Sequence, residues 1–226
     1  MVDLKTPEFL IFLGRNNIYF FEPRAGFAKE VSIPSGVVKD LEVVDPNALS
    51  TLIGSFLDNE KITPGKVVIV ASEAISFTKD IPFSEENKKG VLVQDFTDTI
   101  PLESPEVKVF RTSDLYKVVG INSKYSQVMI ETLVAKGFWV VGLIPGSVIP
   151  EIGPTETITI ETAGKVLLGF DKIRLQNFIE GPPSKNEGRP QAIITTGNPK
   201  GNTIYILVGV FVIGIIALLA LIFLRK

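Results

Sequence analysis

The chain has 226 residues, a formal net charge of −2, no cysteine and no histidine. It therefore offers no disulfide, no thiolate, and none of the side chain that most often serves as a general base or zinc ligand. The balanced charge gives no reason to expect a nucleic-acid partner, because nucleic-acid-binding proteins usually carry a basic face. We expect no catalytic, cofactor-binding or metal-binding residue, no cofactor, and no enzymatic activity.

The first elements are predicted to form an antiparallel β-meander. Two β-rich runs, Glu8 to Leu13 and Ile18 to Glu22, flank the turn cluster Gly14-Arg15-Asn16-Asn17, and a third run covers Phe27 to Ile33. The turn cluster has a second interpretation as a remnant phosphate loop, but the sequence favours a tight turn. Exposed turn residues can contact partners, so Arg15 and Asn16 are candidate partner contacts.

A helix and two strands are predicted next. Asp45 is a good N-cap, Pro46 follows it, and apolar residues recur at helical spacing through Leu57. The continuous apolar run Val67 to Ala71 is typical of a strand buried on both faces. Ile75 to Ile81 predicts another short strand.

The following segment predicts a compact α/β unit. A helix from Ser84 to about Thr97 is expected to bury Val91, Leu92 and Phe96. Strands are expected over Val107 to Arg111 and Leu115 to Ile121, followed by a helix over Lys124 to Lys136 with Ser123 as its N-cap. The strand Phe138 to Ile144 contains Trp139, which we expect in the core. An exposed anchor for a partner is the alternative for that residue.

From Thr155 onwards the sequence carries only weak secondary-structure patterns, followed by a strong pattern of a transmembrane helix. Thr155 to Thr162 alternates like an edge strand, Val166 to Phe178 fits a short helix or strand, and Gly181 to Asn202 has a linker composition. Ile204 to Leu224 is uncharged and as a helix would be roughly 31 Å long, the thickness of a bilayer's hydrocarbon core. The sequence therefore predicts one C-terminal transmembrane helix, with the interface residues Tyr205, Arg225 and Lys226.

The N-terminus lacks the pattern of a signal peptide, because its apolar run is only Phe9 to Leu13 and because Asp3 and Glu8 break the positive charge pattern of a targeting segment. We expect the large N-terminal part to lie in the cytoplasm and the helix to cross the bacterial inner membrane once.

The order of these elements and several phrases resemble the PilM family of type IV pilus assembly proteins and the cytoplasmic domain of GspL from type II secretion. The phrases are IFLGRNNIYFFE from Ile11, KVVIVAS from Lys66, VQDFTDTIPLE from Val93 and AKGFWVVGLIP from Ala135. The resemblance covers about residues 8 to 150 and implies an actin-like fold.

The sequence departs from that family where nucleotide would bind. Actin-like proteins hold nucleotide between two halves, each with an acidic hairpin residue. Phe12 stands where the first acid is expected, and residues 151 to 202 contain no second hairpin of that kind. The resemblance with these departures implies a truncated domain without bound ATP. The paired carboxylates Glu85–Glu86 and Asp95–Asp98 fit a solvated helix face better than acid–base chemistry.

The fold class predicted is thus α/β or α+β: a truncated actin-like domain with a β-meander, a mixed sheet, a small α/β subdomain and one C-terminal transmembrane helix. The expected segments are an actin-like first subdomain (1–82), a small α/β subdomain (83–152), an extension (153–180), a linker (181–202) and the helix (203–226).

The function expected is a membrane-anchored, non-enzymatic scaffold of a type IV pilus or type II secretion-like platform. Its partners would be the membrane and other platform proteins, with a homodimer as a further candidate. A generic tail-anchored adaptor and a degenerate actin-like ATPase are the alternatives.

Overall fold

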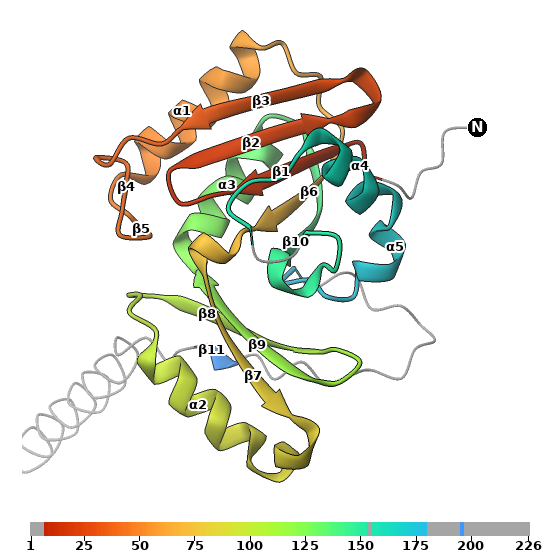
Figure 1. The fold of residues 1–226 in the computed structure, drawn as a ribbon. Helices are drawn as coiled ribbons and strands as arrows, with labels where there is room; N and C mark the ends of the chain where they lie inside the picture. Colours follow the sequence, from red (N-terminus) through yellow and green to blue (C-terminus); the bar gives the residue numbers. More distant parts are fainter. Residues whose placement is uncertain (1–6, 153–154, 180–194, 197–226) are drawn as a thin grey trace, which may run out of the picture. The chain divides into compact units, whose positions relative to one another are not determined.

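A five-stranded mixed sheet, called here the large sheet, has the strand order β10-β6-β1-β2-β3 (Figure 1). The computed structural model describes residues 7–152, 155–179 and 195–196. The strands of the large sheet are β1 (Phe9–Leu13), β2 (Asn17–Glu22), β3 (Phe27–Ser32), β6 (Lys66–Ala71) and β10 (Trp139–Pro145). Antiparallel pairing of β1, β2 and β3 confirms the predicted meander, while β6 pairs in parallel with both β1 and β10.

The turn between β1 and β2 is tight, as predicted. The Gly14 N–H donates to the carbonyl oxygen of Asn17 at 2.8 Å, and a Cβ at Gly14 would lie 3.0 Å from that oxygen. All five residues of β1 are buried, because elements pack on both faces of this central strand.

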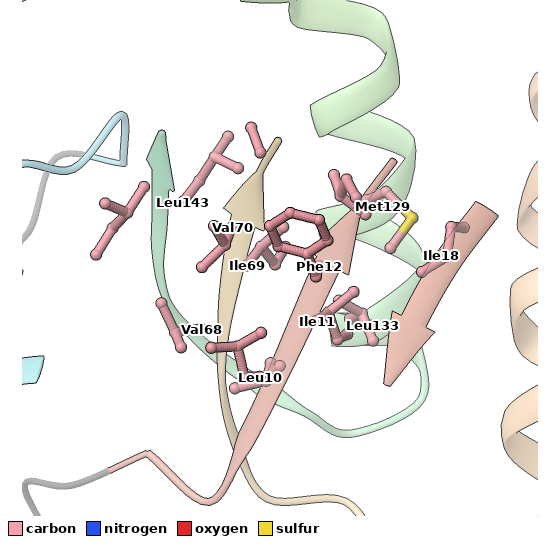
Figure 2. Packing of buried hydrophobic residues seen from close by; sticks show 14 of the residues in the cluster. Leu10, Ile11, Phe12, Ile18, Val68, Ile69, Val70, Met129, Leu133 and Leu143 are labelled. Atoms are coloured by element: carbon pink, nitrogen blue, oxygen red, sulfur yellow. The ribbon is translucent and has the colours of Figure 1, made fainter. Parts of the chain in front are cut away.

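Helices cover both faces of the large sheet (Figure 1). The helices α1 (Pro46–Asn59) and α3 (Ser123–Ala135) contact one another on one face, and α4 (Ile160–Leu168) packs on β1 and β2 from the other. The predicted cap of α1 is present, since Asp45 Oδ1 accepts the Ala48 N–H at 2.9 Å. Figure 2 shows Met129 and Leu133 of α3 on the sheet face that carries Ile11 and Ile18.

A second, antiparallel sheet, called here the small sheet, has the order β11-β8-β9-β7. Its strands are β7 (Ser76–Pro82), β8 (Pro105–Arg111), β9 (Leu115–Asn122) and β11 (Thr195–Thr196), and the helix α2 (Lys89–Thr99) packs on β7. The 3-10 helices η2 (Glu73–Ile75) and η3 (Phe83–Lys88) lead into β7 and α2. A hairpin of β4 (Val38–Lys39) and β5 (Glu42–Val43) precedes α1.

Two details of the small α/β unit differ from the prediction. Val91 is 66% exposed, whereas Leu92 and Phe96 pack against the core of this unit as expected, beside the buried Val93 and Thr97. The helix α2 also begins later than predicted, at Lys89, because residues 83–88 form the separate 3-10 helix η3. The N-cap of α3 is Asn122, whose Oδ1 accepts the Tyr125 N–H at 2.9 Å, so Ser123 is the first helical residue.

The predicted edge strand over Thr155 to Thr162 is wrong. Residues 155–159 form no strand, and α4 begins at Ile160 behind the N-cap Thr159, whose Oγ1 accepts the Thr162 N–H at 3.2 Å. The helix α5 (Phe170–Ile173) follows. Buried side chains from this segment join the main core: Ala163, Val166, Leu167, Phe170, Ile173 and Phe178. Residues 160–179 therefore complete the core.

Among the residues that the structure describes, no helix combines the length and hydropathy needed to cross a bilayer. The predicted span over Ile204 to Leu224 lies outside those residues, as do its interface residues Tyr205, Arg225 and Lys226. Contacts group Met1–Thr196 into one unit, and the predicted segment boundaries within it stay predictions.

Candidate interaction site

The carboxyl ends of parallel strands are a common ligand site in α/β sheets. Here β1, β6 and β10 end at Leu13, Ala71 and Pro145. A cavity of about 10 Å³ lies at this edge, lined by Leu13, Ile75, Tyr125 and Leu143 among others. A cavity of that size holds at most one water molecule.

Phe12 and Tyr125 are core residues at this edge of the sheet. Phe12, at the position where the resembled family has an acid, is fully buried, with its ring 6.4 Å from that of Tyr19. The Tyr125 hydroxyl is buried without a hydrogen-bond partner among the described residues, and burial raises its pKa well above the ordinary value. Tyr125 is therefore protonated at physiological pH and is not available there as a base.

The acidic residues singled out in the sequence lie on α2 and on the turn before it. Glu85, Glu86, Asp95 and Asp98 are all exposed. Glu86 accepts the Tyr116 hydroxyl at 2.6 Å, and Asp98 accepts from the Gln94 amide at 2.8 Å. In the part of the chain that the structure describes, no group of three or more potential ligands is placed to hold a metal ion.

Trp139 lies on the surface, so the expectation that it belongs to the core is wrong. Its side chain is 68% exposed, whereas the preceding Phe138 is 5% exposed and packs edge-on against Phe9 at 5.6 Å between ring centroids. Trp139 is the first residue of β10, an end strand of the large sheet, so nothing in the sheet lies beyond it. The Lys66 Nζ lies 5.4 Å from the centre of the indole ring, in a cation–π contact.

Arg15 and Asn16 are also exposed, as expected for the β1–β2 turn. They follow the carboxyl end of β1, while Trp139 lies at the amino end of β10, which runs parallel to β6 and hence to β1. The three candidate partner contacts therefore lie at opposite ends of the sheet and do not form one site. We define the candidate interaction site as Trp139 and Lys66.

Asn177 protects the outer edge of β10 next to this site. Its Oδ1 accepts the N–H groups of Leu143 and Ile179 at 2.7 and 3.0 Å, and its Nδ2 donates to the Val141 carbonyl at 3.4 Å. Gly142 allows this approach, since a Cβ there would lie 3.3 Å from the Asn177 amide nitrogen. Asn177 thus replaces a neighbouring strand along the carboxyl half of β10, and no strand among the described residues pairs with the outer side of its Trp139 end. No local pattern in the sequence indicates this role.

Comparison with known proteins gives structural matches alone. No family model matches the chain, and no curated protein matches it. A structure of the PilM–PilN type IV pilus biogenesis complex matches with a TM-score of 0.41 and 15% identity, over 59% of this chain and 45% of that chain. The cytoplasmic domain of EpsL, an inner-membrane component of the type II secretion system of Vibrio cholerae, matches with a TM-score of 0.37 and 16% identity, over 61% and 56%.

The chain resembles PilM and EpsL. This agrees with the resemblance to PilM and GspL found in the sequence. The chain spans about half the length of these two solved structures. The candidate site, Trp139 with Lys66, is defined by the geometry of this chain.

Proposed function

We propose that this chain is a non-enzymatic scaffold, anchored in the bacterial inner membrane by its C-terminal helix, with the described domain in the cytoplasm. It recruits another component of a type IV pilus or type II secretion-like platform through Trp139 and Lys66. The choice of platform comes from the sequence resemblance over about residues 8 to 150, and the anchor comes from the apolar run Ile204 to Leu224.

The observation that carries the docking role is the exposure of the chain's single tryptophan. A folding domain gains about 25 cal/mol for each Å² of apolar surface it buries, so a large exposed indole leaves stabilisation unused. Tryptophan is enriched among the residues that dominate binding energy at interfaces. The cavity at the carboxyl ends of the parallel strands, about 10 Å³, is far smaller than a typical ligand pocket, which favours docking over small-molecule chemistry at that edge.

The chemistry of the site suggests what its partner presents. The indole offers a flat apolar surface, and the Lys66 ammonium beside it offers a positive charge. A complementary partner would place an apolar side chain on the indole and a carboxylate near Lys66.

The test is affinity measurement with the full chain in lipid nanodiscs, against purified pilus and secretion platform proteins. Trp139→Ala is expected to weaken binding at least about tenfold, as loss of a hot-spot residue does. Val91→Ala is the matched control, because Val91 is 66% exposed on α2. Equal affinities of the two variants would exclude the proposed site. Capture of a partner from another system would favour the generic adaptor, and binding of magnesium–ATP at millimolar concentration would favour the degenerate ATPase.

Orientation in the membrane needs a separate test, which the absence of cysteine makes simple. Ser35 is exposed between β3 and β4, so Ser35→Cys provides a unique label. A membrane-impermeant maleimide should label it only after the cells are lysed. Labelling in cells whose inner membrane is intact would place the domain on the other side.

A further inference from the structure

The chain leaves the large sheet for the small sheet between β6 and β7, through η2, and it returns between β9 and α3, at Asn122. The cavity of about 10 Å³ lies at this junction, since its lining includes Ile75 of η2 and Asn122. The hydroxyl groups of Ser72 and Tyr125 are buried without a hydrogen-bond partner among the described residues. A void and unsatisfied hydroxyl groups are uncommon in a protein core, and here they coincide with the two chain connections.

The β4–β5 hairpin lies beside α3 and holds this junction (Figure 1). One carboxylate oxygen of Glu42 accepts the Glu103 N–H and the other accepts the side-chain amide of Asn122, both at 2.7 Å. Asn122 uses its side-chain oxygen to cap α3, and the Lys124 ammonium donates to the Val43 carbonyl at 3.1 Å. Since Glu103 lies in the loop between α2 and β8, the hairpin connects that loop to the start of α3.

The turn of this hairpin is strained. Asp40 and Leu41 have φ angles of 50° and 67°, in the left-handed region that glycine adopts most readily. A leucine there is unusual, because its Cβ comes close to the following carbonyl oxygen. Strained backbone persists where the surrounding contacts hold it in place. Those contacts are the packing of Leu41 on the main core and the two hydrogen bonds of Glu42.

We propose that the β4–β5 hairpin is a strained strap that controls movement of the small sheet relative to the large sheet. In the closed strap, Glu42 holds Asn122 and the Glu103 loop together. When the carboxylate of Glu42 leaves these donors, the turn relaxes and the small sheet pivots at η2 and Asn122. Because strain in the closed turn favours opening, the strap opens without global unfolding. This inference does not depend on the proposed function.

The small sheet stays attached when the strap opens. Phe110 of β8 packs edge-on against Phe178, with 5.5 Å between ring centroids, and the Lys108 ammonium donates to the Asn177 carbonyl at 2.6 Å. Neither contact involves the hairpin. The movement is therefore a rotation about the junction, which leaves the main core intact.

Hydrogen exchange on the full chain in nanodiscs tests whether the strap opens locally. Glu42→Ala should speed exchange at least about tenfold in residues 38–43 and 100–104 while β6 keeps its rate. The matched control is Glu131→Ala, because Glu131 is an exposed carboxylate on α3 that accepts the Gln127 amide at 2.8 Å, and it should change exchange by less than about threefold. Equal acceleration in β6, or no acceleration in the hairpin, would overturn the strap. If Glu42→Ala does not fold, Glu42→Gln gives the same comparison, since it keeps one of the two acceptor oxygens.

The strain has its own test in the exposed turn residue Asp40. Asp40→Gly places glycine at a positive φ angle and should slow exchange of residues 38–43 at least about twofold. Unchanged or faster exchange in that variant would overturn the strained turn.

Movement of the small sheet is measured by the distance between two spin labels, which the absence of cysteine allows. Thr51→Cys on α1 and Asp95→Cys on α2 are both exposed. Adding Glu42→Ala should at least double the fraction of molecules outside the main distance, whereas adding Glu131→Ala should leave that fraction unchanged. Faster exchange in the hairpin without any change in the label distances would show that the hairpin opens but does not control the small sheet, and would overturn the proposal.

Discussion

Asn177 provides the sharpest test of how the C-terminal segment holds the sheet. Its side chain makes three hydrogen bonds to backbone groups, two of them on β10 and one on Ile179. The replacement Asn177→Ala removes all three, and the N–H of Leu143 loses its acceptor while the Leu143 carbonyl still accepts the Phe178 N–H.

The expected loss of stability follows from burial. Leu143 is 2% exposed, so its N–H cannot turn to water when Asn177 Oδ1 is lost. A buried, unsatisfied donor costs about 1–3 kcal/mol. The Ile179 N–H lies on a half-buried residue and the bond to Val141 is long at 3.4 Å, so together these add about 1 kcal/mol. We expect Asn177→Ala to lower the free energy of local opening by about 2–4 kcal/mol.

Hydrogen exchange measured by mass spectrometry on the full chain in nanodiscs gives the readout. A loss of 2–4 kcal/mol should speed exchange in the peptide Trp139–Pro145 by about 30- to 700-fold. Gln94→Ala is the control, because it removes an exposed amide whose bond to Asp98 is also short, at 2.8 Å, and it should change exchange by less than threefold. If exchange in β10 stays at the wild-type rate in Asn177→Ala, the hydrogen bonds of Asn177 do not hold the edge of β10.

Two further substitutions test a half-buried carboxyl group and a buried hydroxyl group. Burial raises the pKa of Glu106 in the folded state, and the charge of Lys108 opposes that shift. Because the folded state then binds this proton more tightly than the unfolded state does, Glu106 contributes to the stability of the domain at low pH. That contribution is lost as the pH rises through the raised pKa, above the ordinary value of 4.5. The melting temperature of Glu106→Gln should therefore rise relative to that of the wild type as the pH increases from about 4 to about 7. A difference between the two melting temperatures that stays constant over this range would contradict the prediction. Tyr125→Phe removes a buried hydroxyl that has no partner in the described part of the chain, and should stabilise the domain by about 1–3 kcal/mol in thermal unfolding. Destabilisation by that variant would mean that the hydroxyl is hydrogen-bonded.

The elements that could be predicted are those specified by short-range patterns. Asp45 and Pro46 are adjacent to the helix that they start, and the bond from Ala48 to Asp45 spans three residues. The continuous apolar run of β6 needs no partner to be recognised as a buried strand. The meander likewise depends on a four-residue turn and on strands adjacent in sequence.

The candidate site depends on topology, which local patterns do not contain. Trp139 sits in the apolar run FWVVGLI, but it is the first residue of the end strand β10 and is exposed, whereas the last four residues of that strand are buried. Asn177 acts on Leu143, 34 residues earlier in the chain. The alternation from Thr155 to Thr162 resembles a strand, but Thr159 caps a helix there. That helix is favoured because α4 buries apolar side chains on a sheet face that would otherwise be open.

The segment 160–179 must therefore be part of the folding unit, and removing it provides the last test. It buries six apolar side chains in the main core, among them Val166, Phe170 and Phe178. At about 1.5–3 kcal/mol for each large side chain, their burial contributes on the order of 10 kcal/mol. That equals the whole stability of a typical domain, about 5–15 kcal/mol. A chain ending at Thr159 should accordingly fail to unfold cooperatively and should aggregate, whereas one ending at Ile179 should keep a single thermal transition by circular dichroism. Cooperative unfolding of the shorter chain would show that the sheet and its first three helices are stable by themselves, and that residues 160–179 serve only to connect the domain to the segment that follows it.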